Sequence, residues 1–262
     1  MSGAGGYVLE ARGVGVRFGG VRALDGVDLG VRAGEVCGLI GPNGAGKTTL
    51  FDVLSGIRRP DRGRLLLDGT DVTRRSPVWR ARHGMRRTFQ HRQLFGQLSV
   101  ADNVLVAQEW RGGGGGLAAD LLALPARRAR ERARRERGER VLADCGLGAL
   151  GASYAGGLPV GRARMAELAR AVADPPRVLL LDEPASGTSA GERELLARVV
   201  RRLAREEGCA VLLVEHDVAF VMELCARVVV LDLGTVLAEG TPAEVRADPR
   251  VREAYLGAPG TS

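Results

Sequence analysis

The spacing of apolar residues changes several times along this chain, and each spacing predicts a different kind of element. Residues 7–33 alternate apolar and polar positions, with glycines between them, which predicts short antiparallel strands. Farther along, short runs of valine and leucine without polar interruption lie at 178–181, 211–214 and 228–231. Such runs are typical of strands that a parallel sheet buries on both faces.

Stretches with helical spacing separate these runs. Helices are predicted at 162–172, 192–207 and 218–225, and a longer one at 117–146 with a break at Pro125. Five consecutive glycines precede the longer helix and predict a flexible connection. The pattern therefore predicts an α/β core that a mostly helical insertion interrupts. We divide the chain into a first core part with an N-terminal β subdomain, a helical subdomain, and a second core part with a C-terminal tail, at 1–91, 92–165 and 166–262.

Composition narrows the class of protein. Apolar residues make up 45% and charged residues 26% of the 262 residues, as is usual for a soluble globular protein. No window approaches the ~20 apolar residues that a membrane span needs, and residues 1–6 lack the apolar region of a signal peptide. We therefore expect a cytoplasmic protein that reaches a membrane only through a partner. The four cysteines form no C-x-x-C pair, which favours buried, reduced thiols over a metal cluster.

The net charge is +7, and residues 127–140 hold eight arginines against three glutamates. Nucleic acid binding is one interpretation of such a run. A solvated helix is favoured, because Glu131 with Arg135 and Glu136 with Arg140 are i,i+4 pairs. Contact with anionic lipid or another subunit stays open. Aromatic residues make up only 4%, which argues against a stacking platform for single strands, so we expect no nucleic acid partner.

One segment carries a specific chemical motif. Residues 41–48 fit G-x-x-x-x-G-K-[ST], with a predicted strand at 35–40 before it and a predicted helix at 48–54 after it. Lys47 is the only lysine, since 37 of the 38 basic residues are arginine. A thin lysine stem fits a tight backbone cradle where a broad guanidinium does not. We therefore predict a phosphate-binding loop, with Lys47 on the β- and γ-phosphates and the nucleotide held by Gly41, Pro42, Asn43, Gly44, Ala45, Gly46, Lys47, Thr48 and Thr49.

Two acidic residues and a histidine follow later strands. Parallel α/β sheets place ligands at the carboxyl ends of their strands. Asp182, directly after the run at 178–181, is predicted to hold Mg²⁺ together with the Thr48 hydroxyl. Glu183 is predicted to polarise the attacking water. His216, after the next strand, is predicted to hold that water and Glu183 in line.

Two further candidates depend more on their surroundings. Gln90, where the core meets the helical insertion, can reach Mg²⁺ while its backbone passes movement to the insertion. Phe18, flanked by glycines in the first sheet, can stack on adenine, which presents an apolar π face.

Taken together and in this order, these residues resemble an ATP-binding cassette (ABC) ATPase over roughly residues 8–257. The resemblance implies a P-loop NTPase (RecA-like) α/β core with an N-terminal antiparallel β subdomain and a helical subdomain inserted after the Q-loop at Gln90. It implies an aromatic loop at Phe18, Walker A at 41–48, a signature segment at 158–162, Walker B at 178–183, a D-loop at 186–189 and a switch histidine at His216.

Several segments resemble the branched-chain amino acid importer branch: 87–90, 94–95, 100–104, 214–217, and 239–242 with 254–257 in the tail. The resemblance therefore implies the ATP-hydrolysing subunit of a bacterial importer for branched-chain or other hydrophobic amino acids. Its cofactors would be ATP and Mg²⁺. Its partners would be a second ATPase subunit, transmembrane permease subunits and, indirectly, a solute-binding protein, with the chain peripheral on the inner face of the cell membrane.

The chain departs from the family pattern at two places. The signature, usually L-S-G-G-Q, begins Leu158-Pro159-Val160, and proline offers neither a hydroxyl nor an N–H to a phosphate. Gly161 and Arg162 remain as candidate contacts to the nucleotide of the opposite subunit. The D-loop, usually S-G-L-D, ends in Ser189. These departures suggest a heterodimer in which the partner has the fuller signature; homodimer against heterodimer stays open.

Several alternatives remain. An ABC ATPase of another transporter fits the same motifs, and so does a weakly catalytic, regulatory cassette in a heterodimer. Cassettes that act on DNA or ribosomes typically have long coiled-coil insertions or two cassettes in one chain, and this chain has neither. Another P-loop NTPase, such as a kinase, leaves Gln90 and His216 without a role.

Overall fold

The structure is a computed structural model that describes residues 6–88, 94–108 and 124–256. The chain forms two compact units. One comprises Met1–Arg87, Pro176–Glu183 and Val200–Ser262, and the other comprises Thr88–Pro175 and Pro184–Val199. Helix α7 (Ala190–Glu207) begins in the second unit and ends in the first.

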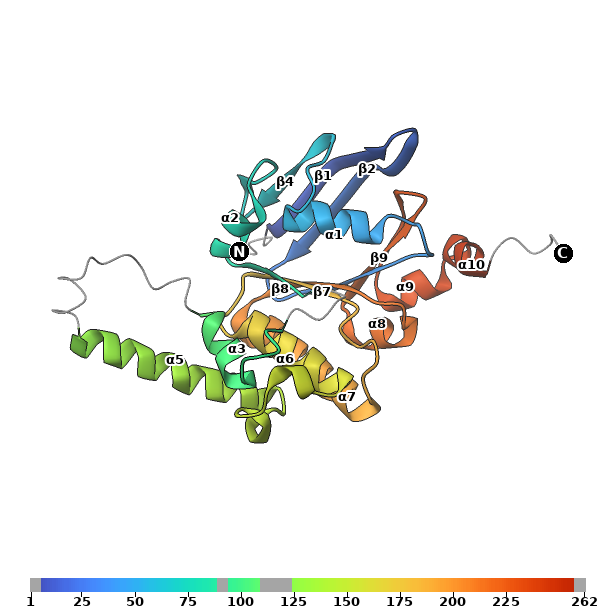
Figure 1. Cartoon of the computed structure of the whole chain (residues 1–262). Helices are drawn as coiled ribbons and strands as arrows, with labels where there is room; N and C mark the ends of the chain where they lie inside the picture. Colours follow the sequence, from blue (N-terminus) through green and yellow to red (C-terminus); the bar gives the residue numbers. More distant parts are fainter. Residues whose placement is uncertain (1–5, 89–93, 109–123, 257–262) are drawn as a thin grey trace, which may run out of the picture. The chain divides into compact units, whose positions relative to one another are not determined.

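The first unit contains an antiparallel sheet of four strands in the order β2-β1-β4-β5 (Figure 1). Its strands are β1 (Tyr7–Phe18), β2 (Val21–Arg32), β4 (Arg62–Leu67) and β5 (Thr70–Asp71). The antiparallel prediction for residues 7–33 is confirmed, although β1 and β2 have 12 residues each and are not short. Bulges in the β1–β2 register accommodate the glycines, so the strands continue across them.

The same unit contains a second sheet, in the order β10-β9-β3-β8-β7-β6. Its strands are β3 (Val36–Ile40), β6 (Met85–Arg87), β7 (Val178–Asp182), β8 (Ala210–Val214), β9 (Arg227–Asp232) and β10 (Thr235–Gly240). All the strand pairs are parallel except β9–β10. Every residue of β3, β7 and β8 is buried, as their uninterrupted apolar runs predicted.

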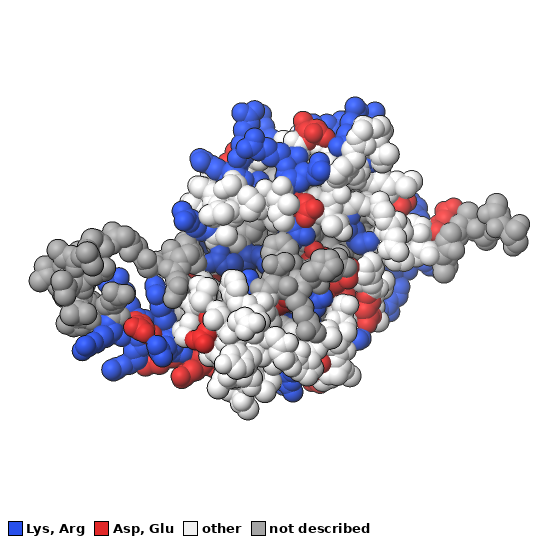
Figure 2. Space-filling model, in the orientation of Figure 1, with Lys and Arg blue, Asp and Glu red and all other residues white. Residues whose placement is uncertain are grey.

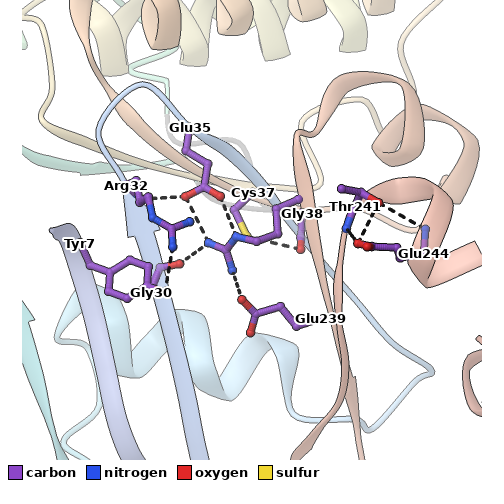
Figure 3. Close-up of polar contacts among 10 residues, drawn as sticks. Tyr7, Gly30, Arg32, Glu35, Cys37, Gly38, Glu239, Thr241 and Glu244 are labelled. Carbon is purple, nitrogen blue, oxygen red and sulfur yellow. Dashed lines mark hydrogen bonds and ion pairs between the residues drawn. The ribbon is translucent and has the colours of Figure 1, made fainter. Parts of the chain in front are cut away.

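The helices of the first unit are α1 (Lys47–Ser55), α2 (Pro77–Arg82), α8 (Val218–Leu224), α9 (Pro242–Ala247) and α10 (Pro249–Leu256). The α/β prediction is confirmed, but the region read as a C-terminal tail is built of β10, α9 and α10. Thr241 and Glu244 form a capping box that starts α9, with the Glu244 Oε2 accepting the Thr241 N–H at 2.7 Å (Figure 3).

The second unit is helical in its described residues. It contains α3 (Val100–Val106), α5 (Leu124–Asp144) and α6 (Val160–Val172), with short 3₁₀ turns at Gly148–Leu150 and Ala155–Gly157. The helix predicted at 117–146 with a break at Pro125 is described as α5 from Leu124 to Asp144, and residues 117–123 lie outside the described residues. Fully buried Asn103 fastens the segment before α3: its Oδ1 accepts the Phe95 N–H at 2.9 Å and its Nδ2 donates to the Phe95 and Ser99 carbonyls.

An ion network joins the two sheets, with Arg227 and Glu35 mostly buried and Glu239 exposed. The Arg227 Nε donates to Glu35 Oε1 at 2.6 Å, its Nη1 donates to Glu239 Oε1 at 2.6 Å, and its Nη2 donates to the Gly30 carbonyl (Figure 3). Burial alone would raise the pKa of Glu35, but the bonds from Arg227 and from the Arg32 N–H hold it below its ordinary value. One guanidinium at the start of β9 thus ties β2, β10 and the turn before β3 together.

The cysteines and the charged residues can be compared with what the sequence predicted. All four cysteines are buried free thiols, as predicted, and burial raises the pKa of Cys37 and Cys209 to about 12. Along α5, Glu131 pairs with Arg135 at 2.9 Å, and most arginines whose side chains are described are exposed. Arginines also gather over the antiparallel sheet (Figure 2). Among the described residues no helix has both the length and the apolarity to cross a membrane.

Candidate functional site

The order of three neighbouring strands determines where the site lies. β3, β8 and β7 lie side by side and run parallel, so their carboxyl ends meet at one edge of the sheet. Ile40 leads there into the glycine loop, Asp182 into Glu183, and Val214 into the segment of His216. Sheet order therefore assembles three segments that lie far apart in the sequence.

The glycine loop is a cradle that side chains would fill. A Cβ on Gly41 would collide with the Leu231 carbonyl oxygen, and one on Gly46 would collide with the Ala23 carbonyl oxygen. Gly46 is also the N-terminal cap of α1 with a φ of 103°, a value that favours glycine. Backbone N–H groups of such a loop, together with the positive end of α1, suit a phosphate.

Lys47 lies inside this cradle. It is 7% exposed, and its Nζ donates to the Gly41 carbonyl at 2.6 Å and to the Pro42 carbonyl at 2.9 Å. Burial lowers the pKa of Lys47, while the nearby charge of Glu183 acts in the opposite direction. The glycine loop is also contacted from α10, where the Tyr255 hydroxyl forms a hydrogen bond with the Gly41 backbone.

Glu183 and His216 form a pair at the same sheet edge. The His216 Nε2 lies 2.9 Å from the Glu183 Oε1, with the two side chains 55% and 15% exposed. Glu183 has a φ of 48°, in the left-handed region that non-glycine residues rarely adopt, and its N–H donates to the Val214 carbonyl at 2.9 Å. Strain of this kind clusters at functional sites. A carboxylate held by a histidine can accept a proton from water.

Asp182 is held from the other side. Its Oδ2 accepts a hydrogen bond from Arg87 Nη2 at 2.9 Å, and Arg87 Nη1 donates to Asp52 Oδ1 at 2.7 Å and to Ser55 Oγ at 2.9 Å. Sequence reasoning missed Arg87 and Asp52. The available signal was spacing, since Asp52 follows Thr48 by four residues and therefore shares its face of α1.

For two predicted site residues, Phe18 and Gln90, the structure does not test the predicted role. Phe18, at the end of β1, is 46% exposed, and the Arg58 guanidinium lies 4.0 Å from the centre of its ring. Arg58 therefore already covers one face of the ring that was predicted to stack on adenine. Gln90 lies outside the described residues. Adenine stacking by Phe18 and magnesium binding by Gln90 stay predictions.

The signature segment has an unpredicted neighbour. Pro159 is the N-terminal cap of α6 and contributes no side-chain hydrogen bond there. The Glu192 carboxylate lies against Gly161, where it would collide with an added Cβ, and it lies 3.7 Å from the Arg162 Nε. The Glu192 Oε2 also accepts from the Ser189 N–H at 2.9 Å, and the Ser189 Oγ accepts from the Glu192 N–H at 3.4 Å, so the two residues form a reciprocal cap at the start of α7. Nucleotide contact by Gly161 and Arg162 stays a prediction, and an anion there would meet the negative charge of Glu192.

A phosphate cradle, a buried lysine and an acid–histidine pair at one sheet edge define the class of P-loop nucleoside triphosphatases. Comparison with known proteins agrees. Residues 24–186 match the profile of the family described as ABC transporter, and residues 235–261 match the one described as branched-chain amino acid ATP-binding cassette transporter.

The similar proteins cover nearly the whole chain. The high-affinity branched-chain amino acid transport ATP-binding protein BraF of Pseudomonas aeruginosa is 40% identical over 250 residues, 95% of this chain and 98% of its own. The corresponding protein LivG of Escherichia coli K12 is 38% identical over the same shares. A crystal structure of the ADP conformation of MJ1267, an ATP-binding cassette of an ABC transporter, aligns with a TM-score of 0.82 and 30% identity, covering 96% of this chain and 99% of that one.

The chain therefore belongs to the ABC transporter family of ATP-binding cassettes. Its members are ATPases that drive transport, and they act as dimers with transmembrane permease components. The fold class and the enzyme class predicted from the sequence are confirmed.

Proposed function

We propose that this chain is the ATP-hydrolysing subunit of an importer for branched-chain or other hydrophobic amino acids. The observation that carries the catalytic part is the 2.9 Å contact of His216 with Glu183 at the edge of the sheet that also bears Lys47. The cargo rests on similarity: BraF and LivG are named for branched-chain amino acid transport, and residues 235–261 match the corresponding family.

The residues present fit a magnesium nucleotide. The Asp182 carboxylate and the exposed Thr48 hydroxyl are hard oxygen ligands of the kind that Mg²⁺ prefers, with Gln90 as a further predicted ligand. Bound Mg²⁺ would neutralise phosphate charge. The chain's own residues would do the rest: the glycine loop and Lys47 hold phosphate oxygens, Glu183 accepts the proton of the attacking water, and His216 keeps the Glu183 carboxylate in place.

The signature segment supports one subunit arrangement, a heterodimer. Pro159 offers no donor, and Glu192 brings a negative charge against Gly161. A phosphate presented by a second subunit would be poorly bound there, which supports a heterodimer whose other cassette has the fuller signature. Permease subunits and, indirectly, a solute-binding protein complete the assembly, and the chain lies on the inner face of the membrane. The functional limits 1–91, 92–165 and 166–262 belong to this proposal.

Glu183→Gln tests the catalytic role. Without the carboxylate the proton acceptor is lost while the phosphate cradle is intact, so we expect ATPase turnover to fall ~100-fold or more with ATP affinity retained. Glu206→Gln, on the exposed face of α7, is the matched control. ATP should then stabilise a dimer of the Glu183→Gln variant with a second cassette and not with itself. Unchanged turnover, or a stable homodimer, contradicts the corresponding part of the proposal.

A regulatory cassette with little activity of its own is the second candidate, because the D-loop ends in Ser189 where the family usually has an acid. It predicts that turnover of an assembled transporter survives Glu183→Gln in this chain and is lost when the equivalent glutamate of the partner cassette is changed.

A further inference from the structure

Arg87 connects two carboxylates from different elements of the first unit. It is the last residue of β6, beside β7, and its guanidinium donates to Asp182 Oδ2 at 2.9 Å and to Asp52 Oδ1 at 2.7 Å. The guanidinium also lies 5.6 Å from the centre of the Phe51 ring. The side chains of Arg87 and Asp182 are only 8% and 9% exposed, so water and salt screen this pair weakly.

The pair lies where the proposed function needs a divalent cation. Asp182 is a proposed Mg²⁺ ligand, and Asp52 lies one helical turn after the other proposed ligand, Thr48. A metal ion that approaches Asp182 therefore meets the positive charge of Arg87 bonded to the same carboxylate. An opposite charge within ~4–6 Å changes the affinity of a carboxylate for a proton by ~10- to 1000-fold, and the same electrostatics apply to a divalent cation.

We propose that Arg87 makes metal binding conditional on the nucleotide. By neutralising Asp182, it keeps the affinity for a bare divalent cation low, and the negative charge of a bound triphosphate restores the attraction. The cation then enters with the nucleotide and not before it. The inference rests on the proposed function, because it takes Asp182 as the metal ligand. Arg87 acts as a positioning residue, since it acts on the metal through Asp182.

Mn²⁺ binding, followed by electron paramagnetic resonance of free Mn²⁺, tests this without any turnover. Wild type without nucleotide should bind Mn²⁺ only at millimolar concentration or weaker, and a non-hydrolysable ATP analogue should tighten binding ~100-fold or more. Arg87→Met keeps an unbranched apolar stem and removes the charge. It should bind Mn²⁺ alone ~10- to 100-fold more tightly than wild type. Adding Asp182→Asn to Arg87→Met should abolish that gain.

Arg177→Met is the matched control, because Arg177 lies just before β7 and forms an exposed ion pair with Asp68 at 3.0 Å. It should leave Mn²⁺ binding unchanged. Equal Mn²⁺ affinity in Arg87→Met and wild type overturns the inference. So does tight Mn²⁺ binding by nucleotide-free wild type, a result that needs no variant to fold.

Binding of a fluorescent ATP analogue, measured once in EDTA and once with Mg²⁺, separates the two proposals. If wild type binds no nucleotide under any condition, the proposed function fails. Suppose instead that wild type binds the magnesium nucleotide, and that Mg²⁺ changes nucleotide affinity equally in wild type and in Arg87→Met. Then only the inference about Arg87 fails.

Discussion

Arg80 should be one of the most sensitive positions for the stability of this protein. It lies in α2, is only 1% exposed, and its guanidinium donates to backbone carbonyls. Two of these, Val53 at 2.8 Å and Leu54 at 2.5 Å, belong to the last turn of α1. A third, Val72, accepts at 2.8 Å. Arg80 thus caps the carboxyl end of the helix whose amino end is the phosphate loop.

Two opposing effects set how much Arg80→Met changes the free energy of unfolding. Burial lowers the pKa of Arg80 from 12.5 to about 10, which at 1.36 kcal/mol per pH unit means that burying the charge costs about 3 kcal/mol. Against that, a hydrogen bond to a charged group contributes ~1.5–3 kcal/mol, so three short ones contribute roughly 5–9 kcal/mol. We therefore expect Arg80→Met to lower the free energy of unfolding by about 2–6 kcal/mol.

Urea unfolding followed by circular dichroism measures this change. Arg82→Met, on the exposed side of the same helix, is the control and should stay within ~0.5 kcal/mol of wild type. Arg80→Lys should fall between the two, because one ammonium group cannot reach all three carbonyls. If Arg80→Met is as stable as Arg82→Met, the guanidinium does not stabilise the end of α1 and the reasoning is wrong.

Two further predictions concern charged groups elsewhere in the first unit. Lys47→Arg should raise the Kd for ATP by about tenfold or more although the charge is retained, because a guanidinium is too broad for the cradle formed by the Gly41 and Pro42 carbonyls. A fluorescence titration measures this Kd, and an unchanged value would refute the prediction. Arg227→Met should lower the free energy of unfolding by about 3 kcal/mol at pH 7. The folded-state pKa of Glu35 is lowered, so its stabilising contribution is complete above the unfolded value near 4.5 and disappears as the pH falls through the folded one. The difference between variant and wild type in urea should therefore shrink below about pH 4, and a constant difference would contradict the assignment.

The sequence predicted much of the first unit because its local signals agree with one another. Short unbroken apolar runs are typical of central parallel strands, and β7 and β8 lie where those runs predicted them. The loop at 41–48 could be identified without coordinates, because its glycines and single lysine are required by the backbone geometry that phosphate binding needs. The sequence did not predict the two helices after Gly240, because α9 and α10 are too short for a helical period to show.

Only the tertiary structure decided which distant residues meet. Strand order places Glu183 beside His216, and no spacing along the chain encodes that order. The partners of Arg87, Arg80 and Arg227 were also invisible, because a chain with 37 arginines gives no local signal for the few that are buried. Burial of a charge depends on which carbonyls and carboxylates converge around it in three dimensions. The sequence thus determined the elements and the phosphate chemistry, whereas the packing of the sheets selected the ionic contacts around the site.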